Sequence, residues 1–196
     1  MIIIGVTGNF GSGKSTVAAM FRERGARTID ADAVVRVLLL HDERCRCAIR
    51  GVFGDAVMTN GEVDRPKLAA AAFKNRRLLR KLESILHPLV KEKLIDQIRK
   101  FRGKMIVLDV PLLIEAGWID MVDAVVVVRA TIKKEVMRLS KRSGHSRATV
   151  LKRLKYQLPF RDKRKFADFV VDNRGSLNDT HKQVKKIMEL LIKTNR

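Results

Sequence analysis

Short apolar runs of strand length alternate along the chain with longer segments in which apolar residues recur at helical spacing. The runs cover residues 2–7, 28–30, 105–110, 124–129 and 169–171. This alternation predicts a parallel sheet, because parallel strands must be joined by crossover connections, which are usually helices. The runs are almost continuously apolar, which indicates that both faces of the sheet are covered. We therefore expect an α/β fold, a three-layer sandwich with a parallel five-stranded sheet in the middle.

Residues 33–102 depart from this rhythm. They contain no convincing strand, but apolar residues repeat at helical spacing in residues 68–73, 78–86 and 89–101. Turn-forming residues, among them Asn60-Gly61, Pro66 and Pro88, punctuate the segment. We interpret it as an all-helical lobe inserted between the second and third strands.

A second interruption is the basic segment Lys141-Arg142-Ser143-Gly144-His145-Ser146, which we interpret as a hinge within a lid. The predicted organisation is a single domain of residues 1–196. Its core comprises residues 1–32 and 103–196, its helical insert about residues 33–102, and its short lid about residues 138–165.

The chain carries 41 Lys and Arg against 21 Asp and Glu, a net charge of +20, with 46% hydrophobic residues. That hydrophobic fraction is ordinary and argues against intrinsic disorder. Four explanations account for such a charge. The protein binds nucleic acid, an anionic membrane or phosphorylated small molecules, or it carries the surface ion-pair networks of a heat-adapted protein. With 5% aromatic residues to stack on bases, we expect no nucleic-acid partner and make no prediction of oligomeric state.

Two further observations bear on location. No apolar run approaches the ~20 residues that cross a bilayer, and the N-terminus lacks the basic region of a secretory signal. We therefore expect a cytoplasmic protein without membrane association. Cys45 and Cys47 have no second cysteine pair to complete a zinc site, so we interpret them as reduced thiols.

The segment Gly8-Asn9-Phe10-Gly11-Ser12-Gly13-Lys14-Ser15 matches the phosphate-binding loop G-x-x-x-x-G-K-[ST] in full, and it lies between a predicted strand and a predicted helix ending near Gly25. Glycines let successive backbone N–H groups converge on phosphate oxygens at the helix N-terminus. Lys14 reaches the β- and γ-phosphates, and the Ser15 hydroxyl is a Mg²⁺ ligand. The chain is thus expected to bind ATP with Mg²⁺ through residues 8–16, Thr16 included.

Carboxylates follow two other predicted strands. Asp30 and Asp32 come at the end of the second strand, where ligands of open α/β sheets bind. We expect Asp32 to accept the proton of an acceptor hydroxyl, and helix capping by this pair is the alternative. Asp109 ends the third strand, where it acts on Mg²⁺ through water or caps a helix over residues 112–116.

These motifs together resemble the dephospho-coenzyme A kinase family, over nearly the whole chain. The matching segments are the loop from Thr7 to Thr16, Ile29-Asp30-Ala31-Asp32 with Arg36, Val63-Asp64-Arg65 with Leu68, Leu86-His87-Pro88-Leu89-Val90, Val110-Pro111-Leu112-Leu113-Ile114-Glu115, Arg138 with Arg142, Gln157 with Pro159, and Ala167-Asp168 with Asp172-Asn173. The phosphate loop is generic to P-loop proteins, whereas the ordered combination is far more specific. Asn9-Phe10, Ser143 and His145 depart from the family's common residues.

The resemblance implies that the ATP γ-phosphate is transferred to the ribose 3′-hydroxyl of dephospho-coenzyme A, with a helical insert that grips the acceptor and a lid over the phosphates. The residues implied to bind the acceptor are Asp32, Arg36, Arg65, His87, Pro111 and Leu112. Asn173 and Gly175 would lie at the adenine.

Some of these assignments have structural alternatives. A histidine before a proline often satisfies backbone groups without touching a ligand, and Arg65 can instead pair with Asp64 or Glu62. Arg138 and Arg142 lie on one predicted helical face with Lys134 and Lys141, and we expect the two arginines to be catalytic rather than part of a solvated stripe.

Rival functions remain at this point. They are another P-loop nucleoside or nucleotide kinase, a nucleic-acid-stimulated ATPase, and a GTP-dependent switch, for which we find no base-specifying motif.

Overall fold

The computed structural model describes residues 1–132, 134–137 and 146–194. The chain divides into two compact units, one of Met1–Asp30 with Arg102–Arg196 and one of Ala31–Phe101. We call them the sheet unit and the helical unit.

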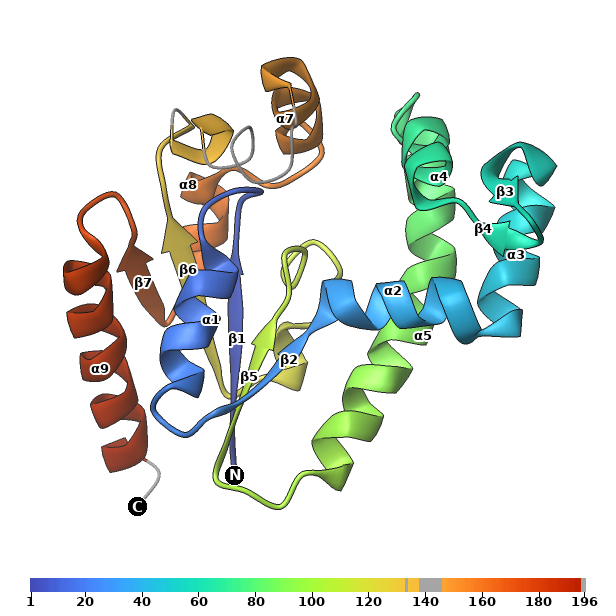
Figure 1. Ribbon diagram of the computed structural model, residues 1–196. Coiled ribbons are helices and arrows are strands. Elements are labelled where there is room, and N and C mark those ends of the chain that lie inside the picture. Colours follow the sequence, from blue (N-terminus) through green and yellow to red (C-terminus); the bar gives the residue numbers. More distant parts are fainter. Residues whose placement is uncertain (133, 138–145, 195–196) are drawn as a thin grey trace. The chain divides into compact units, whose positions relative to one another are not determined.

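Five parallel strands form the sheet unit. They are β1 (Ile2–Gly8), β2 (Arg27–Asp30), β5 (Met105–Asp109), β6 (Ala124–Arg129) and β7 (Phe169–Asp172). Their order is β2-β5-β1-β6-β7 (Figure 1), and every neighbouring pair is parallel. Ile4 and Val6 of the central strand β1 are completely buried. The prediction of a parallel five-stranded sheet is confirmed.

Both faces of this sheet are covered. On one face lie α1 (Lys14–Arg22) and α9 (Leu177–Thr194), which place Phe21 and Val184 in a cluster with Ile4 (Figure 1). On the other face a Cβ at Gly5 would lie 2.5 Å from Leu113 Cδ2, so the chain after β5 packs directly on β1. The remaining short elements are η2 (Ile119–Met121), α7 (Arg147–Leu154), α8 (Phe160–Lys163) and η3 (Arg164–Phe166).

The chain after β5 differs from the expectation. Residues 111–117 form turns, so the predicted helix over residues 112–116 is wrong, and Asp109 caps no helix there. The carbonyl of Pro111 accepts hydrogen bonds from Thr7 Oγ1 at 3.0 Å and from Lys163 Nζ at 3.1 Å. These tertiary partners satisfy the carbonyl that a helix would have used.

The helical unit contains α2 (Ala31–His41), α3 (Glu43–Phe53), η1 (Asp55–Val57), β3 (Met58–Thr59), β4 (Glu62–Val63), α4 (Arg65–Ala72) and α5 (Arg76–Lys100). The side chains of Asp42, Asp64 and Asn75 cap α3, α4 and α5, each accepting from a backbone N–H three residues on, at 3.0, 3.0 and 2.9 Å. The long helix α5 packs against α2, α3 and α4.

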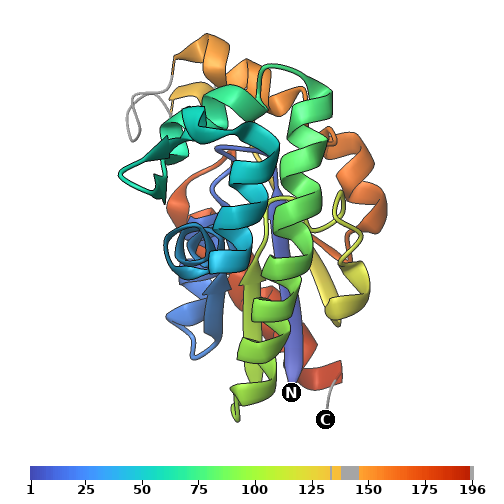
Figure 2. The same cartoon turned by 90° about the vertical axis from the view of Figure 1, so that its right-hand side faces the viewer.

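Two details of this unit were mispredicted. β3 and β4 pair in an antiparallel hairpin, with positive φ at Asn60 and Gly61, so the segment is not entirely helical. The Asn-Gly pair was interpreted as simple punctuation, although it is a strong hairpin signal. Pro88 was also expected to separate helices, but α5 passes through it as one helix (Figure 2).

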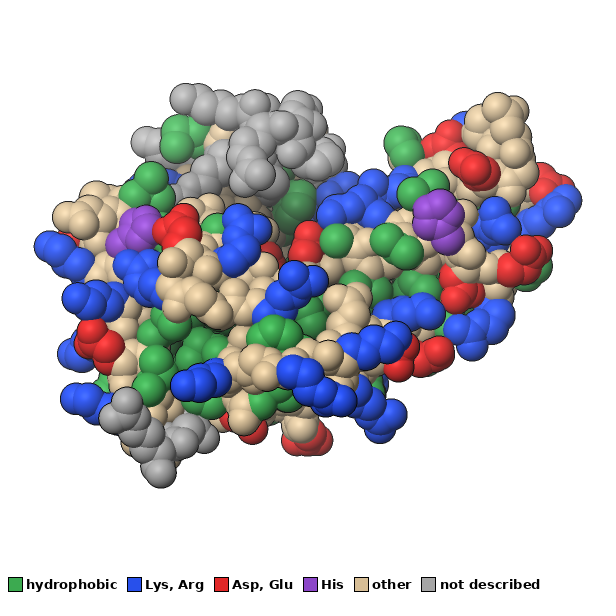
Figure 3. Space-filling view, turned by 60° about the horizontal axis from the view of Figure 1, so that its bottom comes forward, with side chains coloured by type: hydrophobic (Ala, Val, Ile, Leu, Met, Phe, Trp, Pro, Cys, Tyr) green, Lys and Arg blue, Asp and Glu red, His purple; other side chains and the backbone are tan. Residues whose placement is uncertain are grey.

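The surface charge is dispersed on the face shown in Figure 3, where Lys and Arg side chains are spread over the surface with acidic side chains among them. None of the described helices is long and apolar enough to cross a membrane.

The α2 helix offers a matched test of the core of the helical unit. Leu38 is 1% exposed and Leu40 is 41% exposed. We expect Leu38→Ala to lower the free energy of unfolding by about 2–5 kcal/mol, because truncating a buried leucine leaves a cavity. Leu40→Ala is the control, with an effect of less than about 1 kcal/mol. Urea unfolding measures both, and equal losses would contradict the burial of Leu38.

Candidate active site

The phosphate loop connects the central strand β1 to α1. At Gly8 φ is 150°, and a Cβ there would lie 2.6 Å from the Val128 carbonyl oxygen. Gly13 adopts the left-handed conformation (φ 93°) immediately before α1, and no side chain of the described residues caps this helix. The result is a helix N-terminus whose backbone N–H groups are suited to an anion.

Lys14 begins α1 and turns back into the loop. It is 7% exposed, and its Nζ donates to the Asn9 carbonyl at 3.0 Å. Ser15, the next residue, is exposed, so its hydroxyl is accessible from solvent. The Lys14 ammonium thus lies against the loop backbone, and Ser15 follows it in the first turn of α1.

The Asn173 side chain supports the phosphate loop through a hydrogen bond to its backbone. It is 2% exposed, its Nδ2 donates to the Ser12 carbonyl at 2.8 Å, and its Oδ1 accepts from Thr180 Oγ1 at 3.2 Å. The Asn173 side chain therefore links the phosphate loop to α9. Gly175 lies two residues on, exposed in the bend that precedes α9.

A second support comes from α7 and the segment that follows it. The Phe10 N–H donates to Gln157 Oε1 at 2.8 Å, and the Arg153 guanidinium lies 5.0 Å from the centre of the Phe10 ring. The sequence carried no sign of these contacts, because nothing in the loop motif specifies what supports it from outside.

A buried ion pair ties that segment to the chain after β5. Lys163 is completely buried, and its Nζ donates to Glu115 Oε1 and Oε2 at 2.7 and 2.9 Å. Glu115 Oε1 also accepts from the Leu158 N–H at 3.0 Å. Burial lowers the pKa of the Lys163 ammonium, and Glu115 opposes that shift. Sequence reasoning missed Lys163, which is one of several cations in residues 161–165 and has no local mark of burial.

Carboxylates occupy adjacent strand ends in the sheet unit. Asp30 of β2 is the register partner of Asp109 of β5, and Asp109 pairs in turn with Val6 of β1. Asp109 is 5% exposed. Asp32 is exposed in the first turn of α2, which begins directly after Asp30, so Asp32 is not the N-cap residue.

The helical unit carries most of the predicted acceptor residues, whereas Pro111 and Leu112 belong to the sheet unit. Arg36 is exposed on α2, one turn after Asp32, and Arg65 is the exposed first residue of α4. Asp64 accepts from the Lys67 N–H and from Thr59 Oγ1, both at 3.0 Å, so the structure engages it with partners other than Arg65.

His87 lies on α5 and is half-buried. Burial lowers the pKa of its imidazole, which favours the neutral ring.

The remaining predicted residues lie in the turns after β5 or outside the part of the chain that the structure describes. Pro111 and Leu112 are partly buried in the turns after β5. Arg138 and Arg142, like Lys141, lie outside the described residues. Lys134 is described, and its ammonium donates to the Arg174 carbonyl.

Comparison with known proteins gives consistent matches. The family model of dephospho-CoA kinase matches residues 2–179. A dephospho-CoA kinase of Thermus thermophilus is 37% identical, covering 95% of this chain and 90% of its own length. One of Aquifex aeolicus is 41% identical, covering 96% of each chain. A crystal structure from Thermus thermophilus superposes with a TM-score of 0.82 and 38% identity over 97% of each chain.

The buried pair Lys163–Glu115 can be tested by a double-mutant cycle. Lys163→Met should lower the free energy of unfolding by about 3–5 kcal/mol, because it leaves the Glu115 carboxylate without its buried partner. Adding Glu115→Gln, which keeps an acceptor for the Leu158 N–H, should recover part of that loss. Lys165→Met, which removes an exposed pair with Asp162, is the control and should have a much smaller effect. Strict additivity of the two site substitutions in urea unfolding would contradict the coupling.

His87 makes stability depend on pH. Its folded-state pKa is below the usual value of about 6.5, so the unfolded chain takes up the proton first as the pH falls. The stability present above pH ~6.5 is then lost on acidification until the folded-state pKa is reached. We expect His87→Gln to reduce the fall in melting temperature between pH 7.5 and 5.5. His41→Gln, at an exposed histidine, is the control, and an unchanged pH dependence in His87→Gln would refute the assignment.

Proposed function

The chain belongs to the dephospho-CoA kinase family, and we propose that it transfers the γ-phosphate of ATP to the ribose 3′-hydroxyl of dephospho-coenzyme A, giving coenzyme A and ADP in the last step of coenzyme A biosynthesis. The observation that carries the proposal is the family match over residues 2–179, which includes a complete phosphate loop with Lys14 buried against it. Because the family match extends over most of the chain and not only over the phosphate loop, it supports the identity of the acceptor as well as the binding of ATP.

ATP binds through residues 8–16 in this proposal. The backbone N–H groups before α1 hold the phosphates, and the Lys14 ammonium exchanges its bond to the Asn9 carbonyl for bonds to the β- and γ-phosphates. Because the Asn173 side chain is engaged with Ser12, adenine would contact the backbone around Gly175 rather than that amide.

Magnesium fits the donors at this site. The Ser15 hydroxyl and the Asp109 carboxylate are hard oxygen donors, and Mg²⁺ at nucleotide sites takes one or two such protein ligands together with phosphate oxygens and water. When bound, the ion neutralises charge on the β- and γ-phosphates. Ser15 would hold it directly and Asp109 through water.

Asp32 is the proposed general base. The acceptor 3′-oxygen attacks the γ-phosphorus while its proton passes to the Asp32 carboxylate, and the bond to the ADP oxygen breaks. Arg36, Arg65 and His87 would hold the acceptor. Pro111 and Leu112 would add apolar contact, since the Pro111 carbonyl is already engaged by Thr7 and Lys163.

Arg138 and Arg142 are proposed to act from the lid. Guanidinium groups bind phosphate oxygens bidentately and stabilise charge that develops during transfer. We also propose that the protein works in the cytoplasm on this small-molecule acceptor, without a nucleic-acid partner.

An acceptor panel with ATP tests the proposal. Wild-type protein should convert dephospho-coenzyme A to the 3′-phosphorylated product, identified by mass spectrometry, in preference to other nucleosides and nucleotides. Preference for another acceptor would overturn the function.

Asp32→Asn tests the base. It should lower kcat about 10²–10⁴-fold with little change in the KM for ATP, because the amide cannot accept the hydroxyl proton. Asp120→Asn, at an exposed carboxylate in η2, is the matched control. A loss of melting temperature without a loss of kcat would assign Asp32 to helix stability instead.

A further inference from the structure

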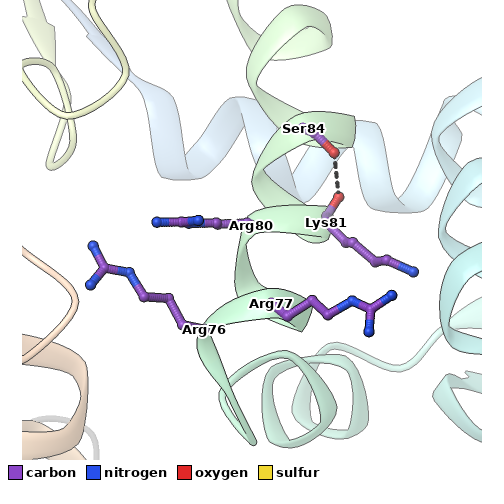
Figure 4. Close-up of a pocket in the computed structure, with 5 residues that line it drawn as sticks. All are labelled: Arg76, Arg77, Arg80, Lys81 and Ser84. Carbon is purple, nitrogen blue, oxygen red and sulfur yellow. Dashed lines mark hydrogen bonds between the residues drawn. The ribbon is translucent and has the colours of Figure 1, made fainter.

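Four cationic side chains gather in the first two turns of α5. Arg76, Arg77, Arg80 and Lys81 line a surface depression together with Ser84 (Figure 4). All four cations are exposed, and within the described part of the chain none forms an ion pair with an acidic side chain. The cluster is thus a concentrated positive charge that no acidic side chain of the described residues pairs with.

This arrangement is unfavourable for the helix that carries it. Arg76 with Arg80, and Arg77 with Lys81, are like charges at i and i+4, which destabilise a helix. Cations at a helix N-terminus also oppose the helix dipole, and the first turn of α5 contains no acidic residue to compensate. Unfavourable local arrangements that bring no evident gain in stability are typical of functional sites. A cluster of four cations is suited to binding an anion.

The four cations point in two directions. Arg76 and Arg80 extend to one side of α5, whereas Arg77 and Lys81 extend to the other (Figure 4). The Ser84 hydroxyl donates to the Lys81 carbonyl at 2.9 Å, so its proton is used within the helix. The guanidinium and ammonium groups are then the donors that this depression offers to an anion, and those of Arg76 and Arg80 lie on the same side of α5 (Figure 4).

That pair shares a helical face with His87. At 3.6 residues per turn, Arg80 precedes His87 by about two turns and Arg76 by about three. All three residues belong to α5 and precede Pro88. Along the axis Arg80 lies about 10 Å and Arg76 about 16 Å from His87. The face thus presents a half-buried imidazole and, further along, two guanidinium groups.

We infer that Arg76 and Arg80 bind the 5′-diphosphate of the acceptor nucleotide while its ribose lies toward His87. The inference rests on the proposed function, because the acceptor has a ribose at the reacting end and a diphosphate between that ribose and its pantetheine arm. Two guanidinium forks match two phosphate groups, and they bind them bidentately. The pair would distinguish an acceptor that carries a diphosphate from a bare nucleoside.

Two double variants of equal charge change test the inference. The first variant, Arg76→Gln with Arg80→Gln, removes the two cations on the helical face that also carries His87. The second variant, Arg77→Gln with Lys81→Gln, removes the same amount of charge from the other side of α5, in the same two turns. Calorimetry measures the Kd for dephospho-coenzyme A, and steady-state kinetics measure the KM for ATP and the inhibition constant of adenosine, which has base and ribose without phosphate.

We expect the Arg76/Arg80 variant to raise the Kd for dephospho-coenzyme A roughly 10- to 100-fold, since charge-assisted phosphate contacts are lost. The KM for ATP and the adenosine inhibition constant should stay within about twofold. Its melting temperature should hold or rise, because like-charge repulsion is relieved. The Arg77/Lys81 variant should bind the acceptor like wild type.

Equal effects of the two variants, an equal effect on adenosine, or no effect on the acceptor would each overturn the inference. These results differ from a failure of the proposed function, in which wild-type protein itself would neither bind nor phosphorylate dephospho-coenzyme A.

Discussion

A phosphate loop presents backbone N–H groups to its ligand, so the loop depends on further contacts to hold its own shape. The Ser12 carbonyl is held by Asn173, the Asn9 carbonyl by Lys14, and the Phe10 N–H by Gln157. Asn173 and Gln157 lie far from the loop in the sequence, so tertiary contacts add to the support that the loop receives from its own Lys14. Pre-arranged donors need no reorganisation when charge develops in the transition state, which is where catalysis gains most from them.

The same support requires a buried charge. Taking the Lys163 ammonium out of water is costly, which explains its lowered pKa, and a buried pair is tolerated when its hydrogen bonds are satisfied. Here the ammonium donates to both Glu115 oxygens and to the Pro111 carbonyl. Glu115 in turn accepts from the Leu158 N–H, next to Gln157. One ion pair therefore links the chain after β5 to the segment that supports the loop.

Sequence patterns predicted the five strands and the phosphate loop because their signals are local: apolar runs of strand length, and glycines at fixed spacing before a lysine. They could not single out Lys163 among the cations of residues 161–165, since burial there depends on Glu115, far away in the sequence. Asn173 was noticed for a nucleotide role, but its bond to Ser12 spans 161 residues and has no local trace. The hairpin at Asn60 differs from these cases, because the sequence does contain a local signal for it, the pair Asn60-Gly61 that favours a two-residue hairpin turn.

The junction between the two units limits the distance between the backbone of the proposed base and the end of β2. β2 ends at Asp30 and α2 begins at Ala31, with no linker between them. Consecutive Cα atoms are 3.8 Å apart, so the Cα of Asp32 stays within about 7.6 Å of that of Asp30. Asp30 is itself held in register with Asp109, beside the strand that leads into the phosphate loop. Because no linker residues intervene, the backbone of Asp32 stays close to the end of β2, at the carboxyl edge where parallel sheets bind their ligands.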